Sequence, residues 1–211
     1  MRRVICSFGF GDAFHPLLML ALPTFARYAA AHDYDLFVPQ ESFFARYADK
    51  LDGRAASWLK VPLIEELLQS HDEVIWLDSD VIICRFDKDI ADDLTQAPLH
   101  MAVHNTPDGA VPNCGVWHVR RAAAETLAAL WQHNSFVRSD VWWEQAALIH
   151  VLGGNPDEPQ VRVPAGPLWS QLPYEWNPHR RDSRGIPATC RFFHATMFKD
   201  RFTAMLTMGS R

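Results

Sequence analysis

Two aspartates, Asp78 and Asp80, interrupt an otherwise apolar run, VIWLDSDVII. Burying an ionised carboxylate without a partner is costly, so this pair needs a cation, hydrogen-bond donors or water beside it. Residues i and i+2 of a strand project to the same side about 6.6 to 6.8 Å apart, so both carboxylates could hold one divalent metal if the strand ends or kinks there. We interpret Asp78 and Asp80 as metal ligands. The alternative is that they are turn residues that end a strand.

Histidines and cysteines suggest no second metal centre. His100 and His104 could share one side of a strand, but no third ligand follows at a spacing that would complete a zinc site. The cysteines form no CxxC pair, which excludes zinc-ribbon and thioredoxin-type motifs, and we expect them as buried free thiols. They are Cys6, Cys84, Cys114 and Cys190.

The segments around the aspartates alternate between strand-like and helix-like patterns. Strands are expected at Val4–Phe8 and at residues 33–39, 74–83, 100–105, 113–119 and 161–164. Helices are expected at Pro16–His32, Ala55–Gln69 with Pro62 in the first turn, Ala122–His133 and Val141–Leu152, and a partly helical connection at residues 87–94. Gln40–Arg54 is predicted to be an irregular or lid-like loop, and Gly166–Pro187 to be rich in loops. This order predicts an α/β fold with a mainly parallel central sheet flanked by helices, with ligands at the carboxyl ends of its strands.

Composition limits the classes of partner. The 211 residues, 48% hydrophobic and 21% charged, predict one globular domain over residues 1–211. A net charge of -5 and a pI near 6.0 argue against a nucleic-acid partner, which requires a basic face. No apolar run approaches the roughly 18 to 20 residues that span a bilayer, so we expect a cytoplasmic protein. The oligomeric state is left open.

Five motifs in a fixed order carry a family resemblance. They are SWLKVPLIEELL, VIWLDSDVII, NCGVWHVRR, WWEQAALIHVL and FFHATMFKD. The ordered set, from about Ala55 to Phe202, resembles retaining glycosyltransferases of the GT-A fold, which have a Rossmann-like nucleotide-diphospho-sugar transferase domain. The similarity is greatest to the galactosyl and mannosyl transferases that include the xyloglucan xylosyltransferases, and more distant to glycogenin-like enzymes. A single DxD motif would be far less specific than this set.

The resemblance implies a metal site and a donor. In the family the DxD aspartates, here Asp78 and Asp80, bind Mn²⁺ or Mg²⁺, which bridges the diphosphate of a nucleotide sugar such as a UDP- or GDP-sugar. A late histidine, here His194, completes the metal site, and a following lysine, here Lys199, neutralises the departing diphosphate. For His194 the alternative is a hydrogen-bonded core histidine, and for Lys199 a surface charge.

The resemblance also assigns residues around the sugar. Lys60 would reach the donor sugar or phosphates, while Asn113 and Gly115 would line the sugar and acceptor pocket, where glycine allows close backbone approach. Glu144 would hold sugar hydroxyls, and Gln145 would lie near the anomeric carbon. A solvated helix lysine, a β-bulge and an ordinary helix surface are the respective structural alternatives.

The nucleotide end of the site is less well marked. Ser7, Phe8 and Asp12 follow the first expected strand, where topology places the nucleotide base. The family often has a glycine after the late histidine, whereas this chain has Ala195 and Thr196 there.

The main hypothesis is therefore a metal-dependent retaining glycosyltransferase that moves a hexose or pentose to an acceptor hydroxyl, such as that of a carbohydrate. The first alternative is a haloacid-dehalogenase-like phosphatase, because LDSDVI also fits its DxD strand, with Asp78 as nucleophile. Against it, about seventy residues precede the motif, which in those enzymes lies near the chain start. The second alternative is a nucleotide-sugar binding protein without turnover.

Overall fold

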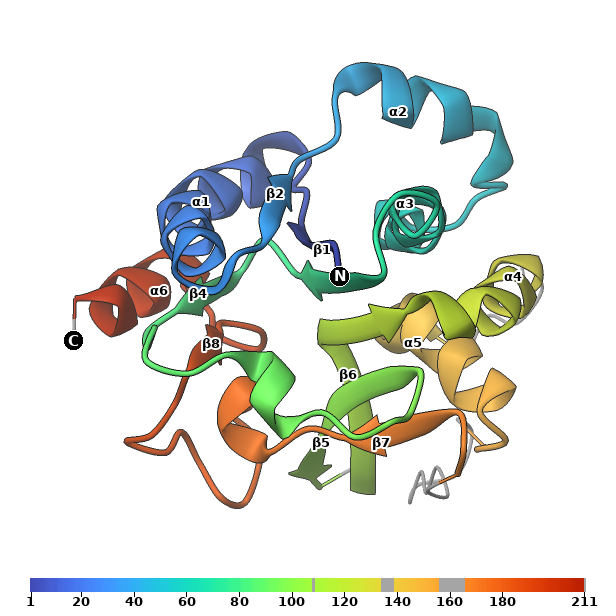
Figure 1. Cartoon of the computed structure of the whole chain (residues 1–211). Coiled ribbons are helices and arrows are strands. Elements are labelled where there is room, and N and C mark those ends of the chain that lie inside the picture. The colour runs from blue at the N-terminus through green and yellow to red at the C-terminus, as the bar shows by residue number, and fades with distance from the viewer. Residues whose placement is uncertain (108, 134–138, 156–165, 211) are drawn as a thin grey trace.

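The computed structural model describes residues 1–107, 109–133, 139–155 and 166–210. In these ranges the strands form a six-stranded sheet in the order β2-β1-β3-β6-β5-β7 and a separate two-stranded sheet of β4 and β8 (Figure 1). The strands are β1 (Arg3–Cys6), β2 (Asp35–Phe37), β3 (Glu73–Leu77), β4 (Val81–Ile83), β5 (Leu99–Thr106), β6 (Gly109–Arg120), β7 (Trp169–Gln171) and β8 (Phe192–His194).

The large sheet is mixed. Three of its strand pairs, β1–β2, β1–β3 and β5–β7, are parallel, and two, β3–β6 and β5–β6, are antiparallel. This confirms the expected mainly parallel α/β class. Because β6 runs against β3, its first half approaches the edge at which β3 ends, where Leu77 pairs with Val116. That antiparallel pair brings the NCG motif to the DSD motif.

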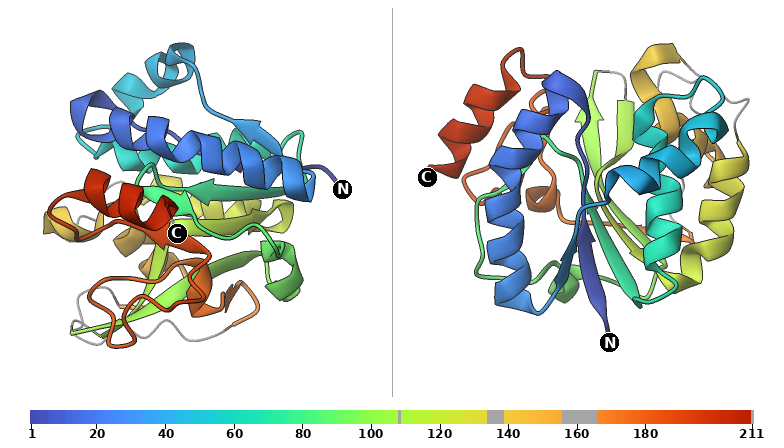
Figure 2. Two further views of the ribbon diagram at one scale, coloured as in Figure 1. Left: turned by 90° about the vertical axis from the view of Figure 1, so that its left-hand side faces the viewer. Right: turned by 90° about the horizontal axis from the view of Figure 1, so that it is seen from above.

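Helices cover both faces of the sheet. They are α1 (Gly11–His32), α2 (Glu41–Tyr47), α3 (Lys60–Leu67), α4 (Ala124–Gln132), α5 (Ser139–Val151) and α6 (Arg201–Gly209). The view from above shows α1 and α6 on one side of the sheet, with α3, α4 and α5 on the other (Figure 2). Short 3-10 turns occur at Ala48–Lys50, Ala56–Leu59, Ile90–Asp93, Arg121–Ala123 and Tyr174–Trp176.

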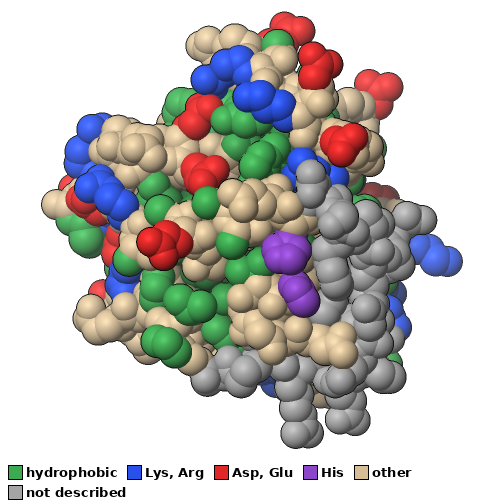
Figure 3. Space-filling model, turned by 90° about the vertical axis from the view of Figure 1, so that its right-hand side faces the viewer, with side chains coloured by type: hydrophobic (Ala, Val, Ile, Leu, Met, Phe, Trp, Pro, Cys, Tyr) green, Lys and Arg blue, Asp and Glu red, His purple; other side chains and the backbone are tan. Residues whose placement is uncertain are grey.

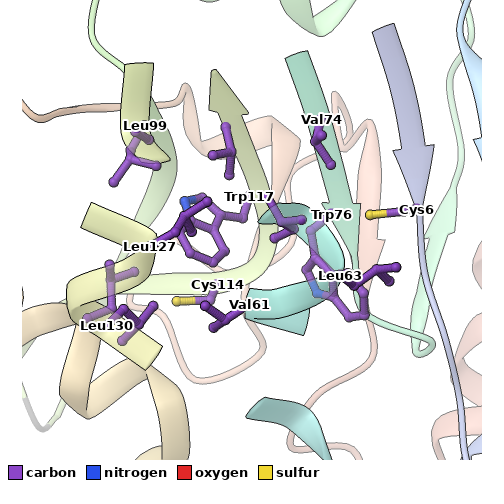
Figure 4. Close-up of a cluster of buried hydrophobic side chains, with 14 of the residues drawn as sticks. Cys6, Val61, Leu63, Val74, Trp76, Leu99, Cys114, Trp117, Leu127 and Leu130 are labelled. Carbon is purple, nitrogen blue, oxygen red and sulfur yellow. The ribbon is translucent and has the colours of Figure 1, made fainter. Parts of the chain in front are cut away.

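The buried strands have two apolar faces. In β3, Val74 and Trp76 enter the core beneath α3 and α4, whereas Ile75 and Leu77 enter the core beneath α1. Alternate side chains of a strand point to opposite faces, so a strand with helices on both sides reads as a continuous apolar run. Figure 4 shows Trp76 and Trp117 projecting from β3 and β6 into the first of these cores.

The apolar run of residues 74–83 is not one strand. β3 ends at Leu77, the chain turns at Asp78 with a hydrogen bond from Val81 N to Asp78 O (3.0 Å), and β4 then pairs with β8 in the second sheet. The expectation of one continuous strand is therefore wrong, because the apolar residues on the two sides of the aspartates enter different sheets. The condition set for metal binding, a strand that ends at the carboxylates, is met.

One of the two loop predictions is wrong, and the other is confirmed. Gln40–Arg54 is not irregular, since it contains α2 and a 3-10 turn. Phe43 and Tyr47 lie one helical turn apart with ring centroids 5.0 Å apart. Phe44 packs 4.1 Å from Phe10, and Tyr47 packs 6.0 Å from Trp131. Tertiary packing of these rings favours a helix that the mixed composition hid. Gly166–Pro187 contains β7 and one 3-10 turn as well as loops, and the strand expected at residues 161–164 lies outside the described residues.

The remaining elements agree with expectation to within a few residues. The cysteines are free thiols as predicted; Cys6, Cys114 and Cys190 are buried and Cys84 is half-buried. Across the described ranges, no helix is long and apolar enough to cross a membrane. On the side shown in Figure 3, hydrophobic side chains outside the grey region form several separate areas among polar and charged atoms.

Candidate active site

Asp78, Asp80 and His194 come together between the two sheets. β4 pairs with β8 so that Val81 lies opposite His194, and Ala195 N donates a hydrogen bond to Asp80 O (2.8 Å). His194 Nε2 lies 3.2 Å from Asp80 Oδ1 and 3.7 Å from Asp78 Oδ2. One ligand atom from each residue lies within 4.8 Å of the others, which confirms that His194 meets the aspartate pair.

These residues fit a divalent metal. Donor atoms at about 2.0 to 2.6 Å from one ion lie within about 5 Å of each other, as these do. Asp80 is buried, and its Oδ2 lies 3.1 Å from Arg201 Nη1 but accepts no hydrogen bond from the described residues, so a lone pair of this oxygen could bind a metal. Carboxylate oxygens with one imidazole suit Mn²⁺ or Mg²⁺ better than a thiophilic metal. Burial raises the pKa of Asp80, but its contacts with His194 and Arg201 outweigh burial and lower the pKa below its ordinary value.

A hydrogen-bonded relay fixes which nitrogen of His194 faces the aspartates. Gly115 N donates to Asn113 Oδ1 (2.9 Å), and this backbone donor identifies the amide oxygen. Asn177 Nδ2 then donates to the same oxygen (2.9 Å), so Asn177 Oδ1 must accept from His194 Nδ1 (3.1 Å). A neutral imidazole with its proton on Nδ1 has its lone pair on Nε2, the atom beside Asp78 and Asp80. The relay therefore orients His194 so that Nε2 could bind a metal held by Asp78 and Asp80.

Gly115 is required by the position of His194. A Cβ at residue 115 would lie 2.2 Å from His194 Cε1 and 2.6 Å from its Nδ1. Gly115 O also accepts a hydrogen bond from Asp78 N (2.8 Å), so Gly115 contacts both Asp78 and His194. The close approach expected at Gly115 is thus made by the imidazole of the late histidine.

Lys60 joins the metal site to Glu144. Its Nζ lies 3.0 Å from Asp78 Oδ1 and 2.7 Å from Glu144 Oε1, and its side chain is 3% exposed. Burial alone would lower the pKa of Lys60, but Asp78 and Glu144 outweigh it and raise the pKa above its ordinary value. Glu144 Oε2 also accepts from Ser57 Oγ (2.7 Å), and Asp78 Oδ1 from Trp76 Nε1 (2.7 Å). Lys60 is therefore a buried cation that pairs with two carboxylates.

Gln145 is attached to the strand that carries the relay. Its Oε1 accepts from Asn113 Nδ2 (3.1 Å) and from Cys114 N (3.2 Å). Trp143, two residues before, has φ 42° and ψ −128°, a conformation that a bulky residue adopts only under strain. This backbone break separates Trp143, which is 49% exposed, from the buried Glu144.

Two cavities meet at the metal site. The first is lined by aromatic and apolar residues together with the candidate metal ligands: Phe8, Gly9, Phe10, Phe14, Ala55, Ala56, Ser57, Lys60, Trp76, Asp78, Ser79, Asp80, Trp143, Glu144, His194, Thr196 and Arg201. Most of the residues that line the second have polar or charged side chains: Lys60, Asp78, His104, Thr106, Val111, Asn113, Cys114, Gly115, Trp143, Glu144, Gln145, His179, Arg181, His194, Thr196 and Met197. The residues that they share define the junction of the cavities: Lys60, Asp78, Trp143, Glu144, His194 and Thr196.

The remaining predicted residues divide into two groups. Phe8 lines the first cavity, and Ser7 before it is buried. Asp12 is exposed in the first turn of α1, and Lys199 is exposed before α6; neither lines one of the two cavities. The structure thus assembles the predicted residues from Lys60 to His194 and leaves these two outside.

Solved structures with the same fold are glycosyltransferases. A glycosyltransferase involved in glycosylation of the major capsid of PBCV-1 is similar over 100% of both chains, with a TM-score of 0.66 and 18% identity. The galactosyltransferase LgtC, solved with donor and acceptor sugar analogs, covers 99% of this chain and 95% of its own, with a TM-score of 0.54 and 11% identity. Mouse xyloside xylosyltransferase 1 covers 93% and 98%, with a TM-score of 0.51 and 13% identity. The chain has the GT-A glycosyltransferase fold. At the level of sequence, neither a protein-family model nor a curated protein matches it.

Within this GT-A fold, several residues of the site were not predicted. Asn177 is fully buried and belongs to no motif, because it lies in the loop-rich segment before β8. His104 and His179 stack with ring centroids 4.7 Å apart on the wall of the second cavity. Arg201 Nη1 lies 3.1 Å from Asp80 Oδ2. In the sequence, His104 was considered only for a zinc site, and Arg201 could have been noticed as a cation seven positions after the late histidine.

Proposed function

We propose that this protein is a metal-dependent retaining glycosyltransferase that moves a hexose or pentose from a UDP- or GDP-sugar to an acceptor hydroxyl. The observation that carries the proposal is the cluster of Asp78, Asp80 and His194, whose ligand atoms lie within 4.8 Å of one another, with Asp78 and His194 at the junction of the two cavities. The fold neighbours, which include a galactosyltransferase and a xylosyltransferase, support this reaction class.

The cavities suit the two substrates. Aromatic side chains of the first cavity can stack on a nucleotide base, and its polar end can receive a diphosphate. Hydrogen-bonding groups of the second cavity suit the hydroxyls of an acceptor. Mn²⁺ or Mg²⁺ held by Asp78, Asp80 and His194 would act as a Lewis acid on the diphosphate. Glu144 and Gln145, at the boundary, are placed to position the transferred sugar.

The carboxylates of the second cavity support retention of stereochemistry. Those among its described lining residues are Asp78 and Glu144, and both pair with Lys60. Neither is then free to act as the general base that an inverting displacement needs to remove the acceptor proton. A front-face route, in which the departing diphosphate takes that proton, fits this arrangement.

The fold favours the transferase over the phosphatase hypothesis. The similar structures are glycosyltransferases, and the Asp78 oxygens face Lys60, Trp76 and His194. A nucleophilic aspartate would need a free oxygen aimed at a phosphoryl group. Binding without turnover is separated from transfer by experiment.

A two-step experiment tests the proposal. First, UDP, GDP, ADP, CDP and dTDP are compared in thermal-shift assays with and without Mn²⁺; a ligand at 100 times its dissociation constant should stabilise the protein by about 2.7 kcal/mol. Second, the corresponding sugar nucleotides are incubated with enzyme and simple glycosides, and products are analysed by NMR. We expect Mn²⁺-dependent binding and a product with the anomeric configuration of the donor. Metal-independent binding, an inverted product or hydrolysis of generic phosphate esters would contradict it, and binding without any turnover would favour the binding-protein alternative.

A further inference from the structure

The two cations of the first cavity differ in how many carboxylates they already pair with. Among the described residues that line it, the cationic side chains are Lys60 and Arg201. Lys60 is 3% exposed and pairs with both Asp78 and Glu144. The two carboxylates therefore already neutralise its charge. Lys199, in the place of the family's lysine, is exposed and lines neither cavity.

Arg201 is held at the rim of the first cavity. It is the first residue of α6, whose start is fixed by Asp200 Oδ1, which accepts a hydrogen bond from Thr203 N (2.9 Å). Its guanidinium lies 5.5 Å from the centroid of the Phe14 ring, which also lines this cavity. Arg201 Nη1 lies 3.1 Å from Asp80 Oδ2, and the side chain remains 33% exposed. A guanidinium has five N–H donors, so most of them remain free for a ligand.

The charge of Arg201 decides whether the metal-bound group would be neutral or positive. Asp78, Asp80 and Glu144 outnumber Lys60 and Arg201 by one charge, so a divalent ion leaves the group with one net positive charge when His194 is neutral. Without Arg201 the group would be neutral towards an incoming anion. The need for positive charge grows as the bond between the anomeric carbon and the diphosphate oxygen breaks.

We propose that Arg201, and not Lys199, binds the donor diphosphate and stabilises it as it departs; this inference rests on the proposed function. In the step concerned, the electron pair of the broken bond stays on the diphosphate oxygen. The acceptor oxygen forms the new bond to the anomeric carbon, and its proton passes to the departing diphosphate. Because Arg201 is a cation beside a metal ligand, it also weakens the binding of Mn²⁺ alone. One side chain thus has opposite effects on two ligands.

The test measures both ligands by calorimetry on the purified full chain. The variants are Arg201→Gln, Arg201→Lys and Lys199→Gln, with Arg85→Gln as the matched control because Arg85 also pairs with an aspartate, Asp87, at 3.4 Å but lines neither cavity. The probes are Mn²⁺ alone, and the nucleoside diphosphate that wild type binds best among UDP, GDP, ADP, CDP and dTDP, at saturating Mn²⁺. Thermal unfolding confirms that each variant is folded.

Arg201→Gln should bind Mn²⁺ alone about 3- to 10-fold more tightly and the nucleoside diphosphate roughly 10- to 100-fold more weakly, the worth of one hydrogen bond to a charged group. Arg201→Lys should recover part of the nucleotide affinity, and Arg85→Gln should match wild type. An unchanged nucleotide affinity in Arg201→Gln would overturn the inference, as would a larger loss in Lys199→Gln than in Arg201→Gln. If wild type itself binds no nucleoside diphosphate, the proposed function fails too, a result that is distinct from failure of Arg201 alone.

Discussion

The two cavities of the site are built by different means. The first cavity takes its aromatic wall from Phe8, Phe10 and Phe14, which follow β1 within a few residues of one another. The second takes polar groups from distant segments, such as His104 on β5, Gln145 on α5 and His179 before β8. A wall of neighbouring rings offers area and stacking, whereas convergent polar groups offer hydrogen bonds of fixed direction.

This difference assigns separate tasks to the two cavities. Shape and stacking suffice to hold a flat base, while recognition of a sugar hydroxyl depends on exact pairing of buried polar groups, which is costly when they are left unpaired. Substitutions at the junction should therefore affect both substrates. Substitutions in one cavity should affect one substrate or, for a structural histidine, only stability.

The largest effect is expected at the candidate metal site, at Asp80, which lines the first cavity beside the junction. Asp80→Ala removes one of the three proposed metal ligands. Mutation of a residue that only supports a metal ligand already lowers metal affinity or activity about 10- to 100-fold, so transfer should fall by more than roughly 100-fold. Mn²⁺-dependent nucleotide binding should be lost while circular dichroism stays native. A folded variant with normal metal-dependent binding would disprove the metal site.

Gly115→Ala should come next. Its methyl group meets the His194 imidazole at 2.2 Å, so the ring must move and metal affinity should fall about 10- to 100-fold. Overpacking should also destabilise the fold by about 1–3 kcal/mol, measured by urea unfolding. The control is a double-mutant cycle with His194→Ala, in which Gly115→Ala should become less costly. Additive energies would show that the clash with His194 is not the cause.

The first cavity is tested by a smaller change. Phe10→Leu keeps apolar bulk but removes a ring that lines the cavity, so donor affinity should fall roughly 2- to 10-fold with acceptor KM unchanged. Phe44→Leu is the matched control, because the Phe44 ring packs 4.1 Å from that of Phe10 without lining the cavity. Equal losses in both variants would mean that Phe10 acts through packing and not through the donor.

The last effect concerns the pH dependence of stability and not catalysis. Burial lowers the pKa of His104 to about 3, and that of His179 to about 4. The unfolded chain, with an ordinary histidine pKa of about 6.5, therefore binds protons first, and each such histidine costs up to about 1.4 kcal/mol of stability per pH unit as pH falls from about 6.5. His104→Gln can still donate to Asn177 O, so it should flatten the slope between pH 6.5 and 5, measured by urea unfolding.

His15→Gln provides the comparison, since His15 is exposed on α1. If both variants keep the full slope of the wild type, the buried histidines of the second cavity do not control its acid sensitivity.

Prediction from sequence succeeded where the information is local or where motifs keep a fixed order. The strand at β3 and the helix at α3 follow from periodicity, and Asp78, Asp80 and His194 were placed together by the ordered motifs. It failed where distant packing decides. The rings of α2 and the break between β3 and β4 depend on partners elsewhere in the chain.

Asn177 illustrates the limit most clearly. An asparagine in a loop-rich segment has no pattern that distinguishes it from a turn residue. Its role follows only from its position between Asn113 and His194, which come from β6 and β8. Lys199 and Arg201 are a second example. They are two positions apart, and the sequence alone could not show which of them lines the cavity.

The pairing of β4 with β8 bears on how the chain folds. It joins segments more than a hundred residues apart, and the Asp80–Ala195 hydrogen bond spans the same distance. Closing so long a loop costs entropy before any contact compensates for it, whereas β1, α1 and β2 can assemble from neighbouring residues. We therefore expect Asp78, Asp80 and His194 to meet only after the central layers have formed. During refolding, tryptophan burial should therefore precede metal binding. An intermediate between these two steps would have a packed core but no assembled metal site.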